Sequence, residues 1–175
     1  MTIENRERPS QHGAILGEAL AMIAAFGRKD LHFPLPEMCL TCAFREGCMT
    51  NQMAGTGKVA LDCVLGLDPD RFACHHAMKE GEPSKLCVGY VAASLAPPSI
   101  VREVVLECNR RLNEMKNGDT DEIREAFDRW RGEVDPDAKM NDYELARAYE
   151  KSPLRRTPIE DARKEYEAAK EKTHE

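Results

Sequence analysis

The residues of this chain best suited to chemistry are cysteines, four of which have spacings that suggest one metal site. Two residues separate Cys39 from Cys42, so a tight turn can direct both sulfurs at a single ion. Cys74 and Cys87 are available as a second pair of ligands. Thirty-one residues lie between Cys42 and Cys74, and twelve between Cys74 and Cys87, so neither gap is that of a standard short zinc finger. The pattern predicts a metal site held by these four cysteines.

The number of cysteines also favours metal binding over a disulfide framework. The chain has 7 cysteines, an odd number that cannot all pair within one molecule. The cytosol keeps thiols reduced, which makes disulfides unexpected in a cytoplasmic protein. The alternative for Cys39 and Cys42 is that both are buried apolar thiols.

Several neighbours of the four cysteines are candidates for supporting roles. His75 or His76 could replace one ligand, and we favour for His75 a hydrogen bond to a ligand, or packing beside the site. Arg45 could offset the negative charge of the thiolates, or simply face solvent. Cys48 could be a further metal ligand, a ligand of an iron-sulfur cluster, or an exposed thiol. We assign Cys63 and Cys108 to packing, because each falls into the apolar pattern of the segment around it.

Zinc is the metal that this set of ligands favours. Four thiolates without an open position are its usual structural site, and such an ion contributes on the order of 10 kcal/mol to folding. Four thiolates also hold iron-sulfur clusters, so a cluster is the alternative cofactor.

The elements that must position these residues are mainly helical by prediction. Aromatic residues make up 6% of the chain, which disfavours a sandwich or barrel. Apolar periodicity predicts helices over residues 11 to 26, ending at Gly27, and 99 to 116. Residues 39 to 98 contain only a possible short element at 59 to 65, and Gly55-Thr-Gly57-Lys58 is expected to be a flexible loop. We therefore expect a mainly α protein with an irregular, metal-stabilised centre; a small α+β fold is the alternative.

Composition divides the chain into a cysteine-rich domain, residues 1 to 118, and an acidic helical tail, 119 to 175. The tail has 17 acidic and 12 basic residues and no cysteine. Short helices are predicted there over residues 121 to 131, 141 to 151 and 158 to 172. The apolar stripe of the last one is narrow, which suits docking on a protein partner.

Charge and hydropathy limit the location and the partners. The net charge of −6 does not favour general binding to nucleic acid, although a local basic patch is not excluded by it. No apolar run is long enough to span a membrane, and the N-terminal residues lack the plan of a signal peptide. We expect a cytoplasmic protein.

Part of the chain resembles a family of small phage and bacterial proteins without assigned function. The similar segments are Cys39-Leu-Thr-Cys42-Ala-Phe-Arg45, Phe72-Ala-Cys74-His75 and Cys87-Val-Gly89-Tyr90. The family pattern is Cys-x-x-Cys-Pro-Trp-Arg, then Cys-His, then Cys-Ala-Gly-Trp or Cys-Ala-Gly-Phe followed by a helix. The resemblance covers about residues 37 to 112 and implies that the four cysteines and His75 act as a set. The resemblance points to phages as one origin of this chain. It implies no activity.

Three functional classes follow from these observations. The first is a non-enzymatic, zinc-stabilised interaction or regulatory protein whose helical tail contacts a partner. The second is an iron-sulfur redox or sensor protein, and the third a metal-dependent enzyme acting on nucleic acid. The sequence favours them in that order.

Overall fold

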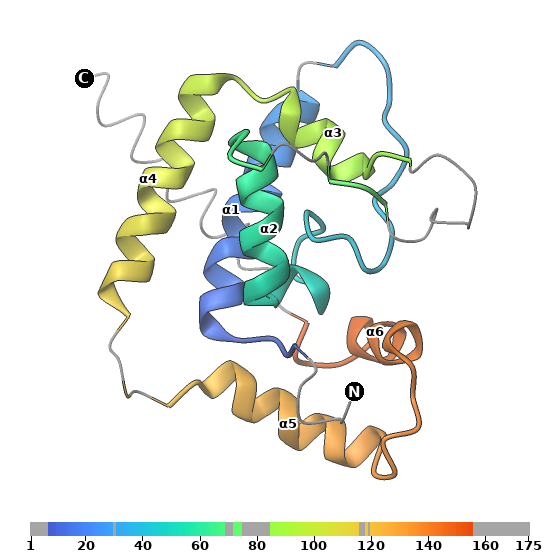
Figure 1. The fold of residues 1–175 in the computed structure, drawn as a ribbon. Coiled ribbons are helices and arrows are strands. Elements are labelled where there is room, and N and C mark those ends of the chain that lie inside the picture. The colour runs from blue at the N-terminus through green and yellow to red at the C-terminus, as the bar shows by residue number, and fades with distance from the viewer. Residues whose placement is uncertain are drawn as a thin grey trace.

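The computed structural model describes residues 7–29, 31–68, 72–74, 85–115, 118 and 120–155. Over these residues the fold is mainly α, as predicted (Figure 1). Paired extended backbone in this part of the chain consists of two isolated antiparallel bridges, Pro9 with Met53 and Ala73 with Leu86. The elements in chain order are α1 (Gln11–Lys29), the 3-10 helix η2 (Thr50–Gln52), α2 (Ala54–Val64), α3 (Val88–Ser94), α4 (Pro98–Glu114), α5 (Glu122–Val134) and α6 (Asp142–Glu150).

Helix α1 is the centre of the fold, with α2, α3, α4 and η2 packed around it. The glycines of α1 let the backbones of neighbouring segments come unusually close to the helix. A Cβ at Gly13 would lie 1.9 Å from the carbonyl oxygen of Gln52, and one at Gly27 would lie 1.7 Å from that of Ala92. The prediction that α1 ends at Gly27 is therefore wrong. The helix continues to Lys29 because Gly27 serves as a contact point for α3 rather than as a C-terminal cap.

Helix α2 corrects a second expectation, since Gly55-Thr-Gly57-Lys58 lies inside the helix and not in a flexible loop. The Glu7 carboxylate accepts hydrogen bonds at the N-terminus of α2 from the backbone N–H groups of Gly55 and Thr56 and from the Thr56 hydroxyl. These N–H groups have no partner within the helix, so an acceptor there stabilises its first turn. Gly57 is buried against Leu16 of α1.

The predicted helices over residues 99 to 116, 121 to 131 and 141 to 151 are confirmed as α4, α5 and α6, with small shifts at their ends. Asp121 caps α5 by accepting from the N–H of Arg124, and it also accepts from the N–H of Gln11 at the start of α1. Asn141 and Glu144 form a capping box at α6. The third predicted tail helix, 158 to 172, lies outside the described residues, as do His75 and His76.

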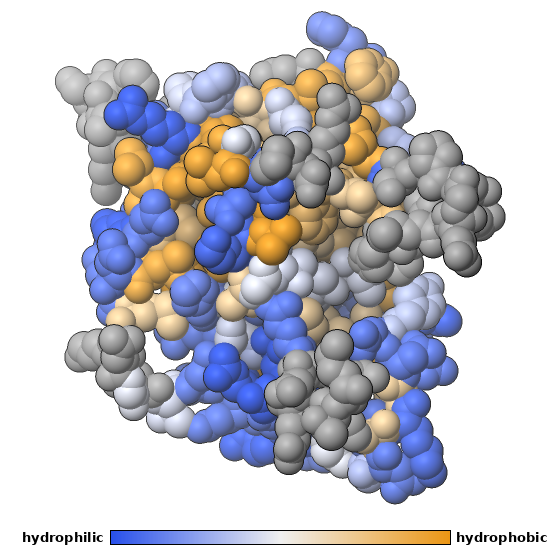
Figure 2. Space-filling model, in the orientation of Figure 1, coloured by the Kyte–Doolittle hydropathy of each residue, from blue (hydrophilic) through white to orange (hydrophobic). Residues whose placement is uncertain are grey.

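Helices α5 and α6 pack into a second cluster, below the bundle around α1 in Figure 1. Its buried members are Met49, Phe127, Leu145, Ala146 and Tyr149. In the same orientation, Figure 2 shows apolar residues over α2 and α4 and mostly hydrophilic residues over α5 and α6. Because Met49 precedes the predicted boundary at residue 118, the cluster joins the two regions, and the division into two domains stays a prediction. None of the described helices is long and apolar enough to cross a membrane.

Candidate metal centre

Cys39 and Cys42 lie in a succession of tight turns before η2. The N–H of Cys42 donates to the carbonyl of Cys39 at 3.2 Å, and the N–H of Arg45 donates to the carbonyl of Cys42 at 3.0 Å. Cys42 is buried, whereas Cys39 is half-buried. The tight turn predicted from the two-residue spacing is therefore present.

Cys74 and Cys87 are brought together by a short antiparallel pairing that the sequence analysis did not predict. The N–H of Cys74 donates to the carbonyl of Lys85 at 2.7 Å, and the N–H of Cys87 donates to that of Phe72 at 3.0 Å. Side chains alternate across paired extended chains, so Phe72, Cys74 and Cys87 share one face. The signal for this pairing was the alternation of Phe72-Ala-Cys74 and Lys85-Leu-Cys87, which is too short to predict a strand by itself.

All four cysteines of the predicted set line one small cavity. The cavity has a volume of ≈ 30 Å³ and is completed by Thr41, Ala43, Thr50, Thr56 and Phe72. The Sγ atoms of Cys42 and Cys87 are 3.4 Å apart. The Sγ of Cys39 lies 4.0 Å from the Oγ1 of Thr41. Cysteines that are 48 positions apart in the sequence thus meet at one place.

The thiols of Cys42 and Cys87 lie close enough to shift each other's pKa. A hydrogen bond from Cys42, with others from the N–H groups of Tyr90 and Gly89, lowers the pKa of Cys87 to about 7. The pKa of Cys42 is raised, because this thiol shares hydrogen bonds with Cys39 and Cys87 and is buried. Cys87 is therefore the member of the pair that becomes a thiolate first.

The gathering of sulfurs falls short of a preformed coordination sphere. Within the described ranges, which leave out His75 and His76, no group of three or more His, Cys, Asp or Glu side chains is arranged closely enough to hold a metal ion. The four cysteines are placed around the same cavity, and the short Sγ–Sγ distance joins Cys42 and Cys87. The structure thus shows a shared location for the predicted ligands, and metal binding itself stays a prediction.

Two of the predicted supporting residues have other partners. The Cys48 thiol is fully buried, donates to the carbonyl of Cys42 at 3.3 Å and accepts from the N–H of Asn51 at 3.4 Å. Burial raises the pKa of Cys48 to about 11. Cys48 therefore stabilises the turn behind the cavity.

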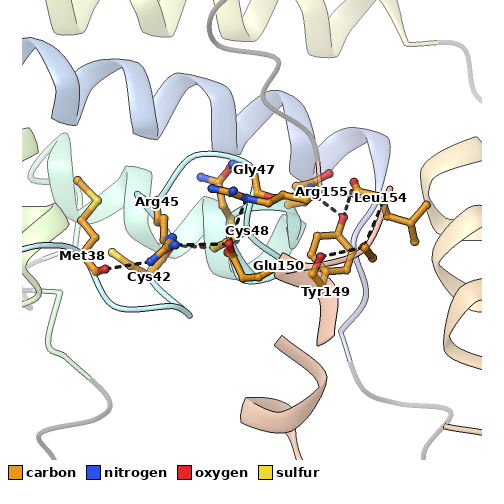
Figure 3. A network of polar contacts seen from close by, with 12 residues as sticks. Met38, Cys42, Arg45, Gly47, Cys48, Tyr149, Glu150, Leu154 and Arg155 are labelled. Carbon is orange, nitrogen blue, oxygen red and sulfur yellow. Dashed lines mark hydrogen bonds and ion pairs between the residues drawn. The ribbon is translucent and has the colours of Figure 1, made fainter. Parts of the chain in front are cut away.

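Arg45 lies between the cysteine turn and Glu150 of α6 (Figure 3). Its guanidinium donates to the carbonyl of Met38 at 3.3 Å and to the carboxylate of Glu150 at 3.4 Å. Arg45 is therefore partly buried and joins the cysteine turn to α6, and its role in offsetting the charge of the thiolates stays a prediction.

Aromatic residues and one glycine form the wall behind the sulfurs. Phe44 is buried and meets the ring of Phe72 edge-on, with centroids 5.6 Å apart. A Cβ at Gly89 would lie 2.5 Å from the Cβ of Phe44 and 2.8 Å from the Sγ of Cys42. Gly89 is thus required for the first turn of α3 to approach the site, a role that the sequence analysis missed. Its signal was the glycine two residues after Cys87.

Cys63 and Cys108 are buried away from the cavity, in agreement with their assignment to packing. Cys108 lies on α4 and its thiol faces the carbonyl of Ile15 at 3.9 Å. Burial raises the pKa of Cys108 to about 11.

Comparison with known proteins gives this chain no relatives: no protein-family model, no curated protein and no solved structure matches it. The resemblance described for residues 37 to 112 therefore stays a prediction.

Proposed function

We propose that this chain is a non-enzymatic, zinc-stabilised protein with an interaction or regulatory role. The observation that carries the proposal is the convergence of Cys39, Cys42, Cys74 and Cys87 on one cavity. These residues come from a turn and from a pairing of two extended segments, which are far apart in the sequence. A shared ion would connect the two segments and stabilise both.

The distance between two of the four sulfurs is close to that of two ligands on one ion. Zinc–sulfur bonds of about 2.3 Å in a tetrahedron place two ligand sulfurs roughly 3.8 Å apart, and the Sγ atoms of Cys42 and Cys87 are 3.4 Å apart. Backbone N–H groups of Phe44, Gly89 and Tyr90 donate to these two sulfurs. Such donors stabilise thiolates, the form in which cysteine binds metals.

Two features favour a structural ion over a catalytic one. Four cysteine ligands leave zinc no open position for water or substrate. The cavity volume of ≈ 30 Å³ is also far below the several hundred Å³ that small-molecule sites usually offer. Function would then lie on surfaces that the ion holds in place, with the helical tail as the region that contacts a protein partner.

Metal analysis of anaerobically purified protein tests the proposal. We expect about one zinc per chain and a colourless sample. Cys42→Ser and Cys74→Ser should each lose the metal and melt at a lower temperature, because each removes a ligand. Cys63→Ser is the matched control, since Cys63 is buried on α2 outside the cavity, and it should keep the zinc.

The same experiment identifies the alternatives. A metal content below about a tenth of an ion per chain, with unchanged melting of both ligand variants, would contradict the proposal. A brown sample with visible absorption that dithionite bleaches would indicate the iron-sulfur alternative.

A further inference from the structure

One continuous segment, residues 38–53, contributes to both clusters of the fold. Cys39 and Cys42 face the cavity, whereas Leu40, Met49 and Met53 pack with α5 and α6. The conformation that places the two sulfurs is therefore also the conformation that completes the second cluster. We call this segment the cysteine turn segment.

A partly buried ionic network fastens α6 to this segment (Figure 3). Glu150, at the end of α6, has a side chain only 13% exposed. Its Oε2 accepts from Arg45 at 3.4 Å and forms an ion pair with the Nε of Arg155 at 3.1 Å. Its other oxygen, Oε1, is buried without a hydrogen-bond partner. A carboxylate in this position depends on its cations, so losing the alignment of Arg45 would be costly. Arg45 in turn is oriented by the carbonyl of Met38, next to Cys39.

A second polar connection lies beside the first. The Gln52 side-chain amide donates to the Tyr149 hydroxyl at 3.0 Å, and that hydroxyl donates to the carbonyl of Leu154 at 3.2 Å. Gln52 and Tyr149 are both fully buried. The same end of α6 is thus attached twice to the segment that carries Cys39 and Cys42.

From this arrangement we propose that metal binding controls the docking of α5 and α6. This inference rests on the proposed zinc site. The ion fixes the cysteine turn segment, which then presents Arg45, Met49 and Gln52 to α6. Without the ion the segment loses this alignment, α5 and α6 separate from it, and the apolar face around Phe127, Trp130 and Tyr149 becomes accessible.

The chain contains its own reporter for this change. Trp130 is the one tryptophan in the sequence, and its ring packs against Phe127 and Tyr149 at centroid distances of 5.6 and 5.5 Å. Trp130 does not line the cysteine cavity. Removal of the metal would therefore change the Trp130 fluorescence by changing how α5 and α6 dock. Hydrogen exchange of α4, which packs on α1, reports whether the rest of the fold persists.

The test compares the full-length zinc-loaded protein before and after a zinc chelator. We expect the Trp130 emission to shift to longer wavelength and the amides of α5 and α6 to exchange about tenfold faster or more, with α1 and α4 largely unchanged. Adding zinc back should reverse both changes. If α1, α4, α5 and α6 lose protection together, the metal stabilises the whole fold. The proposal that it controls the docking of α5 and α6 is then wrong.

Variants of the ionic network complete the test. Glu150→Gln and Arg45→Gln should keep the zinc content of the original chain but show faster exchange in α6 even with zinc bound. Glu107→Gln is the matched control, because Glu107 forms an exposed ion pair on α4 and should change neither property. If zinc binds but its removal leaves Trp130 and α6 unchanged, this inference is wrong and the proposed zinc site stands. If no zinc binds, both fail.

Discussion

The cluster around α1 and the cluster of α5 and α6 are built on different principles. Around α1, small residues such as Gly13 and Gly27 bring backbones together, and the polar centre is a group of thiols from distant parts of the chain. In the second cluster, Phe127 and Tyr149 fill the space with large rings on helices that carry their own caps. An added Cβ would clash at the close backbone contacts, whereas the second cluster is held by the packing of large side chains.

Phe127→Ala should show how independent the second cluster is, and it should have the largest effect. Removing a fully buried ring costs about 4 kcal/mol, because Phe127 packs against both Trp130 and Tyr149. We expect hydrogen exchange to lose protection in α5 and α6 while α1 keeps it. If α1 loses protection to the same extent, the two clusters form one cooperative unit and the contrast between them disappears.

Gly27→Ala tests the close contact between α1 and α3. The added Cβ would overlap the carbonyl of Ala92, so we expect a loss of about 3 kcal/mol in urea unfolding. Gly132→Ala on α5 is the matched control, because nothing in the described part of the chain, apart from its own turns of helix, lies within 4 Å of the added Cβ. That change should stabilise the protein by up to about 1 kcal/mol through helix propensity. Equal effects of the two substitutions would show that the packing of α1 on α3 is loose.

Asn141→Ala should have a smaller effect, confined to α6. The Asn141 side chain accepts from the N–H of Glu144 at 2.9 Å, and the Glu144 carboxylate accepts from the N–H of Asn141 at the same distance. Loss of this cap costs about 1 kcal/mol. Asn109→Ala, on the exposed face of α4, is the control and should be neutral or slightly stabilising. A comparable loss in thermal unfolding of both variants would argue against a stabilising cap.

Local signals in the sequence were sufficient for much of the helical structure. Helices α1, α4, α5 and α6 were predictable because periodic apolar residues and caps act within a few positions of each other. The same signals failed at Gly27 and at Gly55-Thr-Gly57-Lys58, where contacts with distant segments outweigh the low helix propensity of glycine.

The sequence by itself determined a mainly helical chain and singled out Cys39, Cys42, Cys74 and Cys87. The tertiary structure decided that these four line one cavity, that Cys48 faces the carbonyl of Cys42, and that Arg45 pairs with Glu150 of α6. Residue types and short spacings express local preference, which the chain carries in its sequence. Meetings between positions as distant as 45 and 150 depend on how helices pack, and no local pattern encodes that packing.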